Sequence, residues 1–317
     1  MLNNSASKIE HKKFAFVIPT FNQADYLTRA LKSVLKQKGN DYQIIVVNDG
    51  STDNSDEILN NFSQIPHLHL YSQSNAGPNV ACAEAIRRSN ADYIIFMATD
   101  DALRPNYLEN IRAILSKAPN IDMIFGNYCS ISEEKNIKIS QHTFPLNSPI
   151  ESFKKYIEGE LAMSTCGTLV KRNIMDTYIN YPRPYPANYD TVIMAHCLLM
   201  YDCYQSSDVF VDVYAHKNRF RDSYYPETNG KNIVEIMFDQ QIIGTDVNVQ
   251  SLKNRFLAKS HRTNARSSYR AKKWTEACKS YALAFKIQPL AILNINTCKR
   301  FLICFVRMVI SNVFNAR

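Results

Sequence analysis

Three short polar clusters in the first third of the chain carry residue types that could bind a ligand and act on it. Each cluster follows a short apolar run, and the three span Pro19–Asn22, Asn48–Asp53 and Thr99–Asp101. Asn, Asp, Gly and Ser also favour turns for local reasons, so any one cluster could equally be an ordinary polar turn. Three such clusters at successive strand ends would place carboxylates and hydroxyls around one crevice.

The residue types indicate what chemistry such a crevice could support. A carboxylate such as Asp49 can accept hydrogen bonds from the N–H of a uracil-like base or from ribose hydroxyls. The adjacent carboxylates of Asp100 and Asp101 form a hard-oxygen site for Mg²⁺ or Mn²⁺, which also takes diphosphate oxygens. The chain has no G-x-x-x-x-G-K-[ST] loop and no G-x-G-x-x-G. Neither a P-loop nor an ordinary dinucleotide site is therefore indicated.

The segments around these clusters predict alternating strands and helices. Apolar runs typical of buried strands occupy Phe14–Ile18, Gln43–Val47, Leu68–Tyr71 and Tyr93–Met97. Helical periodicity or helix-favouring sequence separates them, over Tyr26–Gln37, Asp53–Phe62 and Asn79–Ser89. Strands that are apolar throughout and separated by helices indicate a parallel sheet covered on both faces. Because ligands bind beyond the carboxyl ends of such strands, the three clusters lie where a site is expected.

The pattern is looser in the second half of the chain. Further strands are predicted at Met123–Gly126 and Gly167–Val170, and further helices at Ile150–Gly159 and Thr191–Met200. Beyond Asn229 the sequence is helical almost to the end. We therefore expect an α/β domain over residues 1–229 and a basic helical region over residues 230–317.

Net charge and cysteine content limit the classes of protein to which the chain can belong. Residues 252–317 contain 14 Lys and Arg and one acid, a net charge of +13, so within the total of +8 the rest carries −5. A basic tail suits nucleic acid, an anionic membrane or a polyanionic partner, but no nucleic-acid reader motif is present. The 8 cysteines are scattered, which favours buried reduced thiols of the kind found in a cytosol.

No targeting or spanning segment is evident. The polar, mixed-charge start excludes an ordinary secretory signal, and no apolar run reaches the roughly 18 residues of a membrane span. We expect a cytoplasmic protein, either soluble or peripheral on the inner face of the cell membrane.

Four motifs taken together resemble those of family 2 glycosyltransferases in order and spacing. They are Phe16–Asn22, Ile45–Asp53, Asn75–Gly77 and Phe96–Asp101, and the resemblance covers roughly Phe14–Tyr225. The family implies a GT-A fold, in which a doubly wound, mostly parallel nucleotide-sugar-binding sheet is joined to an acceptor-binding region. It also implies inverting transfer of a sugar from a nucleotide-diphosphate donor, most often a UDP-sugar, with a divalent metal such as Mn²⁺ or Mg²⁺.

The resemblance assigns roles to residues of the motifs. Pro19, Thr20 and Asn22 should lie along the nucleotide, and Asp49 should contact its base. Gly77 should let the backbone approach the ribose or the sugar. Asp100 and Asp101 correspond to the acidic motif that binds the metal. Asp100 is also expected to contact the nucleotide-sugar donor. The sequence departs from the commoner D-x-D-D form because Ala98 stands at the first acidic position, which leaves the number of protein ligands open.

Inverting transfer also needs a base that takes the proton of the acceptor hydroxyl. The family places an acid far downstream, often in a Glu-Asp pair that opens a helix, and the best match is Asp190. Tyr189 replaces the Glu, and Asp190 could instead cap the helix. Weaker rivals are Asp176, Asp202 and Glu160.

A basic segment beyond the predicted base resembles the family element that reaches the diphosphate. Its candidates are His216, Lys217, Arg219 and Arg221, although such a run is more often a solvated loop.

Two further hypotheses concern partners. The segment Thr297–Arg317 mixes apolar and basic residues, so it suits either a helix lying on anionic lipid or a helix packed on protein. By analogy with the family, the acceptor would be a glycan or a lipid-linked sugar, as in bacterial polysaccharide assembly. The alternative function is a non-catalytic nucleotide- or glycan-binding protein that retains the fold, which Ala98 and the missing Glu favour.

Overall fold

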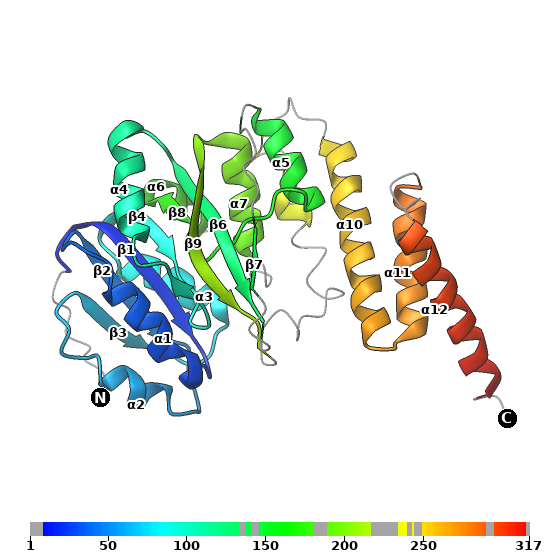
Figure 1. The fold of residues 1–317 in the computed structure, drawn as a ribbon, viewed down its shortest axis with the longest axis horizontal. Coiled ribbons are helices and arrows are strands. Elements are labelled where there is room, and N and C mark those ends of the chain that lie inside the picture. Colours follow the sequence, from blue (N-terminus) through cyan, green and yellow to red (C-terminus); the bar gives the residue numbers. More distant parts are fainter. Residues whose placement is uncertain are drawn as a thin grey trace. The chain divides into compact units, whose positions relative to one another are not determined.

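The computed structural model describes residues 9–132, 137–140, 146, 148–179, 189–216, 234–239, 243, 249–289 and 295–314. The chain divides into two compact units, one of residues 1–153 with 161–225 and one of residues 154–160 with 226–317. The predicted boundary at residues 229 and 230 lies outside the described residues. Figure 1 shows the elements of both units, which are taken in turn.

Four parallel strands form one half of the sheet in the first unit. They are β1 (Lys12–Thr20), β2 (Tyr42–Asn48), β3 (Leu68–Ser72) and β4 (Ala91–Phe96). Their order is β3-β2-β1-β4, with β1 parallel to both β2 and β4. The predicted parallel sheet is confirmed here. Because the chain adds β2 and β3 on one side of β1 and β4 on the other, the strand order reverses at the β1–β4 pair, where open α/β sheets bind ligands.

The other half of the sheet is mixed. The order continues from β4 as β8-β6-β9-β5, with β7 paired to β6. Only the β6–β9 pair is parallel in this half, among the described strands. The bounds are β5 (Ala102–Leu103), β6 (Met123–Ile131), β7 (Ile137–Ile139), β8 (Leu169–Lys171) and β9 (Cys203–Tyr214).

Sequence reasoning found the positions of β6 and β8 but missed β9, which is the longest described strand. The reason is its burial pattern, in which exposed and buried residues mix without a continuous apolar run. Periodicity cannot identify such a strand. Its end nevertheless reaches the acidic pair, as described below.

Helices alternate with the parallel strands as predicted. The bounds are α1 (Ala24–Leu35), α2 (Ser55–Asn60), α3 (Pro78–Arg88), α4 (Tyr107–Lys117), α5 (Pro149–Glu158), α6 (Arg172–Ile179) and α7 (Tyr189–Met200). The first three helices, α5 and α7 confirm predictions, whereas α4 and α6 were not predicted.

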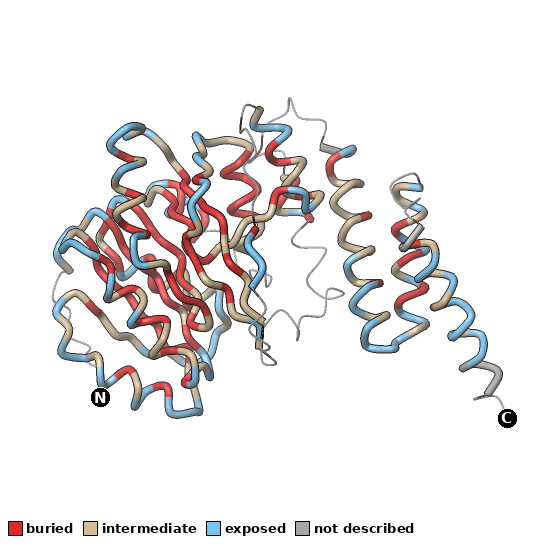
Figure 2. Tube along the Cα trace, in the orientation of Figure 1, coloured by how far each residue is buried: buried red, intermediate tan, exposed pale blue. Residues whose placement is uncertain are grey.

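The main core lies where α1 and α4 pack on one face of the sheet. Along β1, alternate side chains point to opposite faces, and Phe14, Phe16 and Ile18 enter this core with no exposed surface. The Phe16 ring lies 5.6 Å from the ring of Tyr42 and 6.2 Å from that of Tyr107 on α4. Figure 2 shows the buried residues concentrated along the central strands. The parallel strand ends are thus held by a fully packed scaffold.

The second unit contains a hairpin of two helices and a third helix. They are α10 (Val249–Arg270), α11 (Trp274–Ile287) and α12 (Ile295–Phe314). A small core joins them, made of Ala265, Ala277, Cys278, Tyr281 and Cys304. The predicted helical C-terminal region is therefore present. All eight cysteines are free thiols.

Candidate active site

The Asp49 carboxylate at the end of β2 is buried and accepts three hydrogen bonds from its own chain. Its Oδ1 accepts from Gln73 Nε2 at 2.7 Å and from the Ala76 N–H at 2.9 Å, and its Oδ2 accepts from the Gly77 N–H at 2.8 Å. Each hydrogen bond to a charged group contributes about 1.5–3 kcal/mol. Asp49 therefore fixes the loop that leads from β3 to α3, while its predicted contact with a nucleotide base stays a prediction.

Two glycines let this loop lie close to the strand ends. Gly77, just before α3, has φ of 93°, and a Cβ there would meet no atom within 4 Å. The Gly77 backbone therefore faces open space, as close approach to a ligand requires. Gly50 has φ of 74°, and a Cβ there would lie 2.8 Å from the backbone nitrogen of Asn75. Any larger residue at position 50 would push the loop away.

Thr20 at the end of β1 carries a hydroxyl that lacks a partner. Its carbonyl oxygen accepts the Asp49 N–H at 2.8 Å, but its buried Oγ1 has no hydrogen-bond partner in the described part of the chain. Leaving a buried hydroxyl unpaired costs about 1–3 kcal/mol. A ligand atom at the end of β1 would remove that cost, which favours the predicted place of Thr20 along a nucleotide.

Asn22 joins the loops that follow β1 and β2. Its backbone has φ of 51°, its N–H donates to Ser51 Oγ at 3.0 Å, and its Oδ1 accepts the Thr52 N–H at 2.7 Å. The side chain is thus engaged in shaping the crevice. Its predicted contact with the nucleotide stays a prediction.

Asp100 is paired with the predicted diphosphate-binding histidine. The His216 Nε2 lies 3.0 Å from Asp100 Oδ2, and only 8% of the histidine side chain and 22% of the aspartate side chain are exposed. The His216 ring lies 4.3 Å from that of Tyr26. The Arg29 guanidinium donates to the Asp100 carbonyl oxygen at 2.6 Å and covers the Tyr214 ring at 3.7 Å. The structure therefore brings His216 to the acidic pair, whereas its contact with a diphosphate stays a prediction.

Asp101 is more deeply buried than Asp100 and is held from two sides. It is 5% exposed, and its Oδ1 accepts the Tyr214 N–H at 3.1 Å. The Cys166 thiol is also hydrogen-bonded to it. Burial, followed by the charge of Asp101, raises the pKa of the Cys166 thiol well above its usual value. The thiol is therefore protonated at neutral pH and can donate.

The acidic pair offers carboxylate oxygens of the kind that bind divalent cations. The described residues contain no group of three or more His, Cys, Asp or Glu that could hold a metal by themselves. Two adjacent carboxylates still offer the oxygen ligands that Mg²⁺ and Mn²⁺ prefer, and Mg²⁺ is commonly held by one or two carboxylates and substrate phosphates. Among the described residues, these two carboxylates are therefore compatible with a cation that a bound ligand also coordinates, and the metal site stays a prediction.

Asp190 lies in the first turn of α7 with both carboxylate oxygens engaged. Its Oδ2 accepts from Thr165 Oγ1 at 2.8 Å, and its Oδ1 accepts from the N–H of Thr191 at 2.9 Å. The contact with Thr191 is local to the first turn and is not the bond to an N–H two or three residues on that defines a helix cap. The contact with Thr165 joins Asp190 to another segment, and its role as base stays a prediction.

A cavity of about 240 Å³ brings Asp190 to the switch point of the sheet. Pro19 of β1 and Ala98, just beyond β4, line it together with Asp190. Most of the remaining lining is apolar. Cys82 of α3 also lines it, and burial, followed by the charge of Asp190, raises the pKa of the Cys82 thiol to about 12. Cys82 therefore stays protonated at neutral pH.

The weaker candidates for a base lie elsewhere. Asp176 binds Arg172 at 3.0 Å and Asp202 donates its N–H to Asp122, both near the starts of strands at the opposite edge of the sheet. Glu160 belongs to the second unit. The predicted cations Lys217, Arg219 and Arg221 lie outside the described residues.

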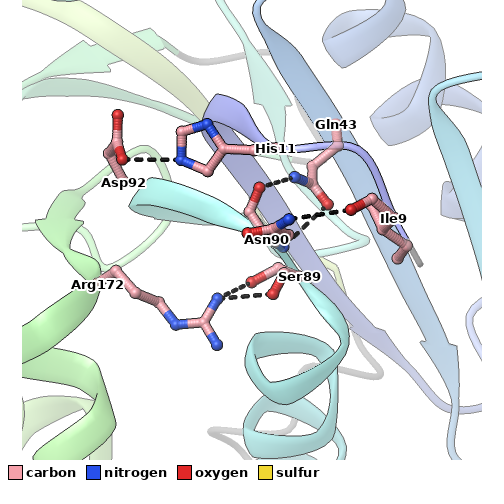
Figure 3. Close-up of polar contacts among 7 residues, drawn as sticks. All are labelled: Ile9, His11, Gln43, Ser89, Asn90, Asp92 and Arg172. Carbon is pink, nitrogen blue, oxygen red and sulfur yellow. Dashed lines mark hydrogen bonds and ion pairs between the residues drawn. The ribbon is translucent and has the colours of Figure 1, made fainter.

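That opposite edge carries a polar network of its own (Figure 3). Arg172 donates to the carbonyl oxygen and to the hydroxyl of Ser89 at 2.7 Å, and Gln43 donates to the Asn90 carbonyl oxygen at 2.6 Å. These contacts join the residues at or just before the starts of β2, β4 and α6. They serve the scaffold, because the switch point lies at the other edge.

Sequence reasoning missed several residues that shape the site. Gln73 holds Asp49, Arg29 and Tyr26 surround Asp100 and His216, and Thr165 holds Asp190. No local pattern signals them, since each acts on a residue more than 20 positions away in the sequence. Only the folded topology brings them together.

Comparison with known proteins gives a consistent family assignment. The family model described as "Glycosyl transferase family 2" matches residues 15–178. The chain is 33% identical over 126 residues to glycosyltransferase GlyA of Streptococcus pneumoniae, a match that covers 39% of this chain and 18% of GlyA. It is 30% identical over 121 residues to poly(ribitol-phosphate) beta-N-acetylglucosaminyltransferase TarP of Staphylococcus aureus, covering 37% of each protein. The chain thus matches well under two thirds of either relative.

Solved structures show the same fold. The crystal structure of S. aureus TarS 1-349 in complex with UDP-GlcNAc is similar with a TM-score of 0.68 and 17% identity, over 96% of this chain and 92% of that chain. The complex of TarS 1-349 with UDP has a TM-score of 0.65. The predicted GT-A fold with a helical C-terminal extension is confirmed.

The three hydrogen bonds to Asp49 predict a stability effect. Asp49→Asn removes the charge and turns an NH₂ group toward at least one buried donor, so the free energy of unfolding should fall by about 1–3 kcal/mol. Urea denaturation measures it. As a matched control, the exposed Asp25→Asn on α1 should cost less than about 1 kcal/mol. Equal losses in the two variants would contradict a special role for Asp49 in holding the loop.

Proposed function

The chain belongs to glycosyl transferase family 2, and on that premise we propose that it transfers a sugar, with inversion, from a UDP-sugar to a hydroxyl of an acceptor. The observation that carries this proposal is the position of Asp190. Its carboxylate lines a cavity between the ends of β1 and β4, where the strand order of the sheet reverses. This position supports a role for Asp190 as the base beside a donor that binds at these strand ends.

The proposed reaction follows from this arrangement. The acceptor hydroxyl attacks the anomeric carbon and its proton passes to Asp190, while the bond between that carbon and the diphosphate oxygen breaks on the opposite side. The nucleoside diphosphate leaves with the electron pair, and the configuration at the carbon inverts. A positioned general base of this kind typically contributes about 10²–10⁴-fold to the rate.

The acidic pair serves the leaving group in this proposal. Asp100 and Asp101 would hold Mn²⁺ or Mg²⁺, which offsets the negative charge that develops on the departing diphosphate. The proposed role of His216, which contacts Asp100 through Nε2 at 3.0 Å, is to bind a phosphate oxygen of the donor. The unpaired Thr20 hydroxyl and the Gly77 backbone line the nucleotide.

The donor and acceptor are proposed only by class. TarS is described in complex with UDP-GlcNAc and with UDP, and the name of TarP specifies transfer of N-acetylglucosamine to poly(ribitol-phosphate). We therefore place UDP-GlcNAc first among the UDP-sugars to be tested. A glycan or a lipid-linked sugar is the proposed acceptor.

Release of nucleoside diphosphate tests this function. The protein incubated with Mn²⁺ and a panel of nucleotide sugars should release UDP from at least one donor, by hydrolysis or by transfer to an added glycan. Excess EDTA should stop the release, and added Mn²⁺ should restore it. Tight nucleotide binding without release from any donor would instead support the non-catalytic binding protein. Full activity in excess EDTA would contradict the proposed role of the metal but not the proposed sugar transfer.

The role of Asp190 gives a second prediction. Asp190→Asn keeps the shape and the bond to Thr165 but removes the proton acceptor, so transfer should fall by about 10²–10⁴-fold. The dissociation constant of the donor, measured by calorimetry, should change little. Because Asn is also a good helix cap, unchanged transfer in this variant would mean that Asp190 serves only as a cap.

The exposed apolar face of α12 concerns whether the protein works at a membrane surface. Its outer side exposes Leu302, Phe305, Val306, Val309 and Ile310, each between 44% and 63% exposed. Lys299, Arg300 and Arg307 lie on the same helix, and no described helix is long and apolar enough to cross a bilayer. An exposed apolar stripe with neighbouring cations suits the surface of an anionic membrane. We propose that α12 binds such a surface, because the strongly basic charge of this region opposes packing against a second copy.

Vesicle co-sedimentation tests the α12 proposal. The protein should sediment with phosphatidylglycerol vesicles and not with phosphatidylcholine vesicles, and Phe305→Asp should abolish sedimentation. Leu283→Asp, at a residue 46% exposed on α11, is the matched control and should bind normally. An oligomer in solution that Phe305→Asp dissociates, or binding that both variants lose, would overturn the proposal.

A further inference from the structure

A single turn joins the proposed base to the acidic pair. Within Ser164–Thr168, the Thr168 N–H donates to the Thr165 carbonyl oxygen at 3.0 Å, and Thr168 Oγ1 donates to the Ser164 carbonyl oxygen at 2.7 Å. Gly167 has φ of 77°, a conformation that closes the turn and favours glycine. The turn is therefore fixed by its own hydrogen bonds.

The same turn is anchored to the end of β4. The Gly167 N–H donates to the Phe96 carbonyl oxygen at 2.8 Å, and the Phe96 N–H donates to the Thr168 carbonyl oxygen at 3.1 Å. Since β4 runs directly into Ala98 and the acidic pair, any displacement of the turn is resisted by the backbone of the strand. Two backbone hydrogen bonds therefore tie the turn to the strand that leads into the acidic pair.

Adjacent side chains of the turn point to different parts of the site. The Cys166 thiol lies 3.5 Å from the Ala98 nitrogen and is hydrogen-bonded to Asp101. The neighbouring Thr165 hydroxyl donates to Asp190 Oδ2 at 2.8 Å. One peptide unit therefore separates the group that holds the acidic pair from the group that holds the base.

We propose that Thr165 is a positioning residue for catalysis, which sets the direction and place of the Asp190 carboxylate relative to the acidic pair. The proposal rests on the proposed function of Asp190 as the base. Thr165 does not itself exchange a proton with the substrate, because its hydroxyl group donates its hydrogen bond to Asp190 Oδ2.

Asp190 needs such a residue because it lies on a helix, so a further contact must fix its carboxylate relative to the sheet. Its other oxygen is bonded to the adjacent Thr191 N–H, a contact that moves with α7 and relates the carboxylate only to its own helix. Thr165 is the described link between this carboxylate and the β4 end of the sheet. Threonine suits the task because its branched Cβ restricts rotation about χ1. A base misplaced by about 1 Å can cost on the order of 10²-fold in rate.

Thr165→Val tests the proposal, since it keeps the shape and removes the donor. The expected result is a fall in kcat of about 10–100-fold, with a donor dissociation constant changed by less than about twofold. Thr165→Ser restores the hydroxyl and should recover most of kcat. A purely structural role would not give this split between turnover and donor binding or this rescue.

Thr168→Val is the matched control, because it removes a hydroxyl from the same turn without touching Asp190, while the backbone hydrogen bonds of the turn and those to Phe96 remain. It should lower the melting temperature at least as much as Thr165→Val while lowering kcat far less. An unchanged kcat in Thr165→Val, or an equal loss of kcat in both variants, overturns the proposal even when the wild-type protein is active. A wild-type protein inactive with every donor overturns the proposed function itself, and with it the positioning role.

Discussion

The reversal of strand order at the β1–β4 pair is the constraint on which the site depends. Parallel strands end at one edge, and the connections after β1 and β4 leave the sheet in opposite directions, so their ends are not covered by the same helix. Thr20 and the acidic pair lie at or beyond the ends of these two strands, and Asp49 follows the neighbouring strand β2. The buried core beneath α1 and α4 makes the strand ends rigid. The order of the strands therefore determines where in the fold the site lies.

The carboxylates of the site are oriented before any ligand arrives. Asp49 accepts three hydrogen bonds, Asp101 accepts the Tyr214 N–H, Asp100 is paired with His216, and Asp190 is held by Thr165. Dipoles and charges that are fixed in advance need no reorganisation during a reaction, which is the main electrostatic advantage of an enzyme site. The contacts of Asp49 also stabilise the fold, because they tie the loop before α3 to the end of β2.

The sequence predicted the parallel half of the sheet and the residues at its strand ends. This succeeded because β1, β2 and β4 are buried on both faces and read as continuous apolar runs. It failed for β9, whose mixed burial hides it, and for α4. Of the candidate site, Asp49, Asp100 and Asp101 were predicted from their types and their places after strands, and Asp190 from the family resemblance. The residues that orient them, such as Arg29 and Thr165, were not, since their role arises from contacts between distant segments that no local pattern encodes.

The way Asp49 holds the loop before α3 has a consequence for divergence among related sequences. Two of its three partners are backbone N–H groups, at Ala76 and Gly77, which every residue except proline supplies. The course of the loop is therefore largely independent of the side chain at position 76, whereas positions 50 and 77 are restricted by their positive φ. Substitutions at position 76 can change what the loop presents to a ligand without changing its path. Such a loop gives evolution a place to alter selectivity while the scaffold and the reaction stay the same.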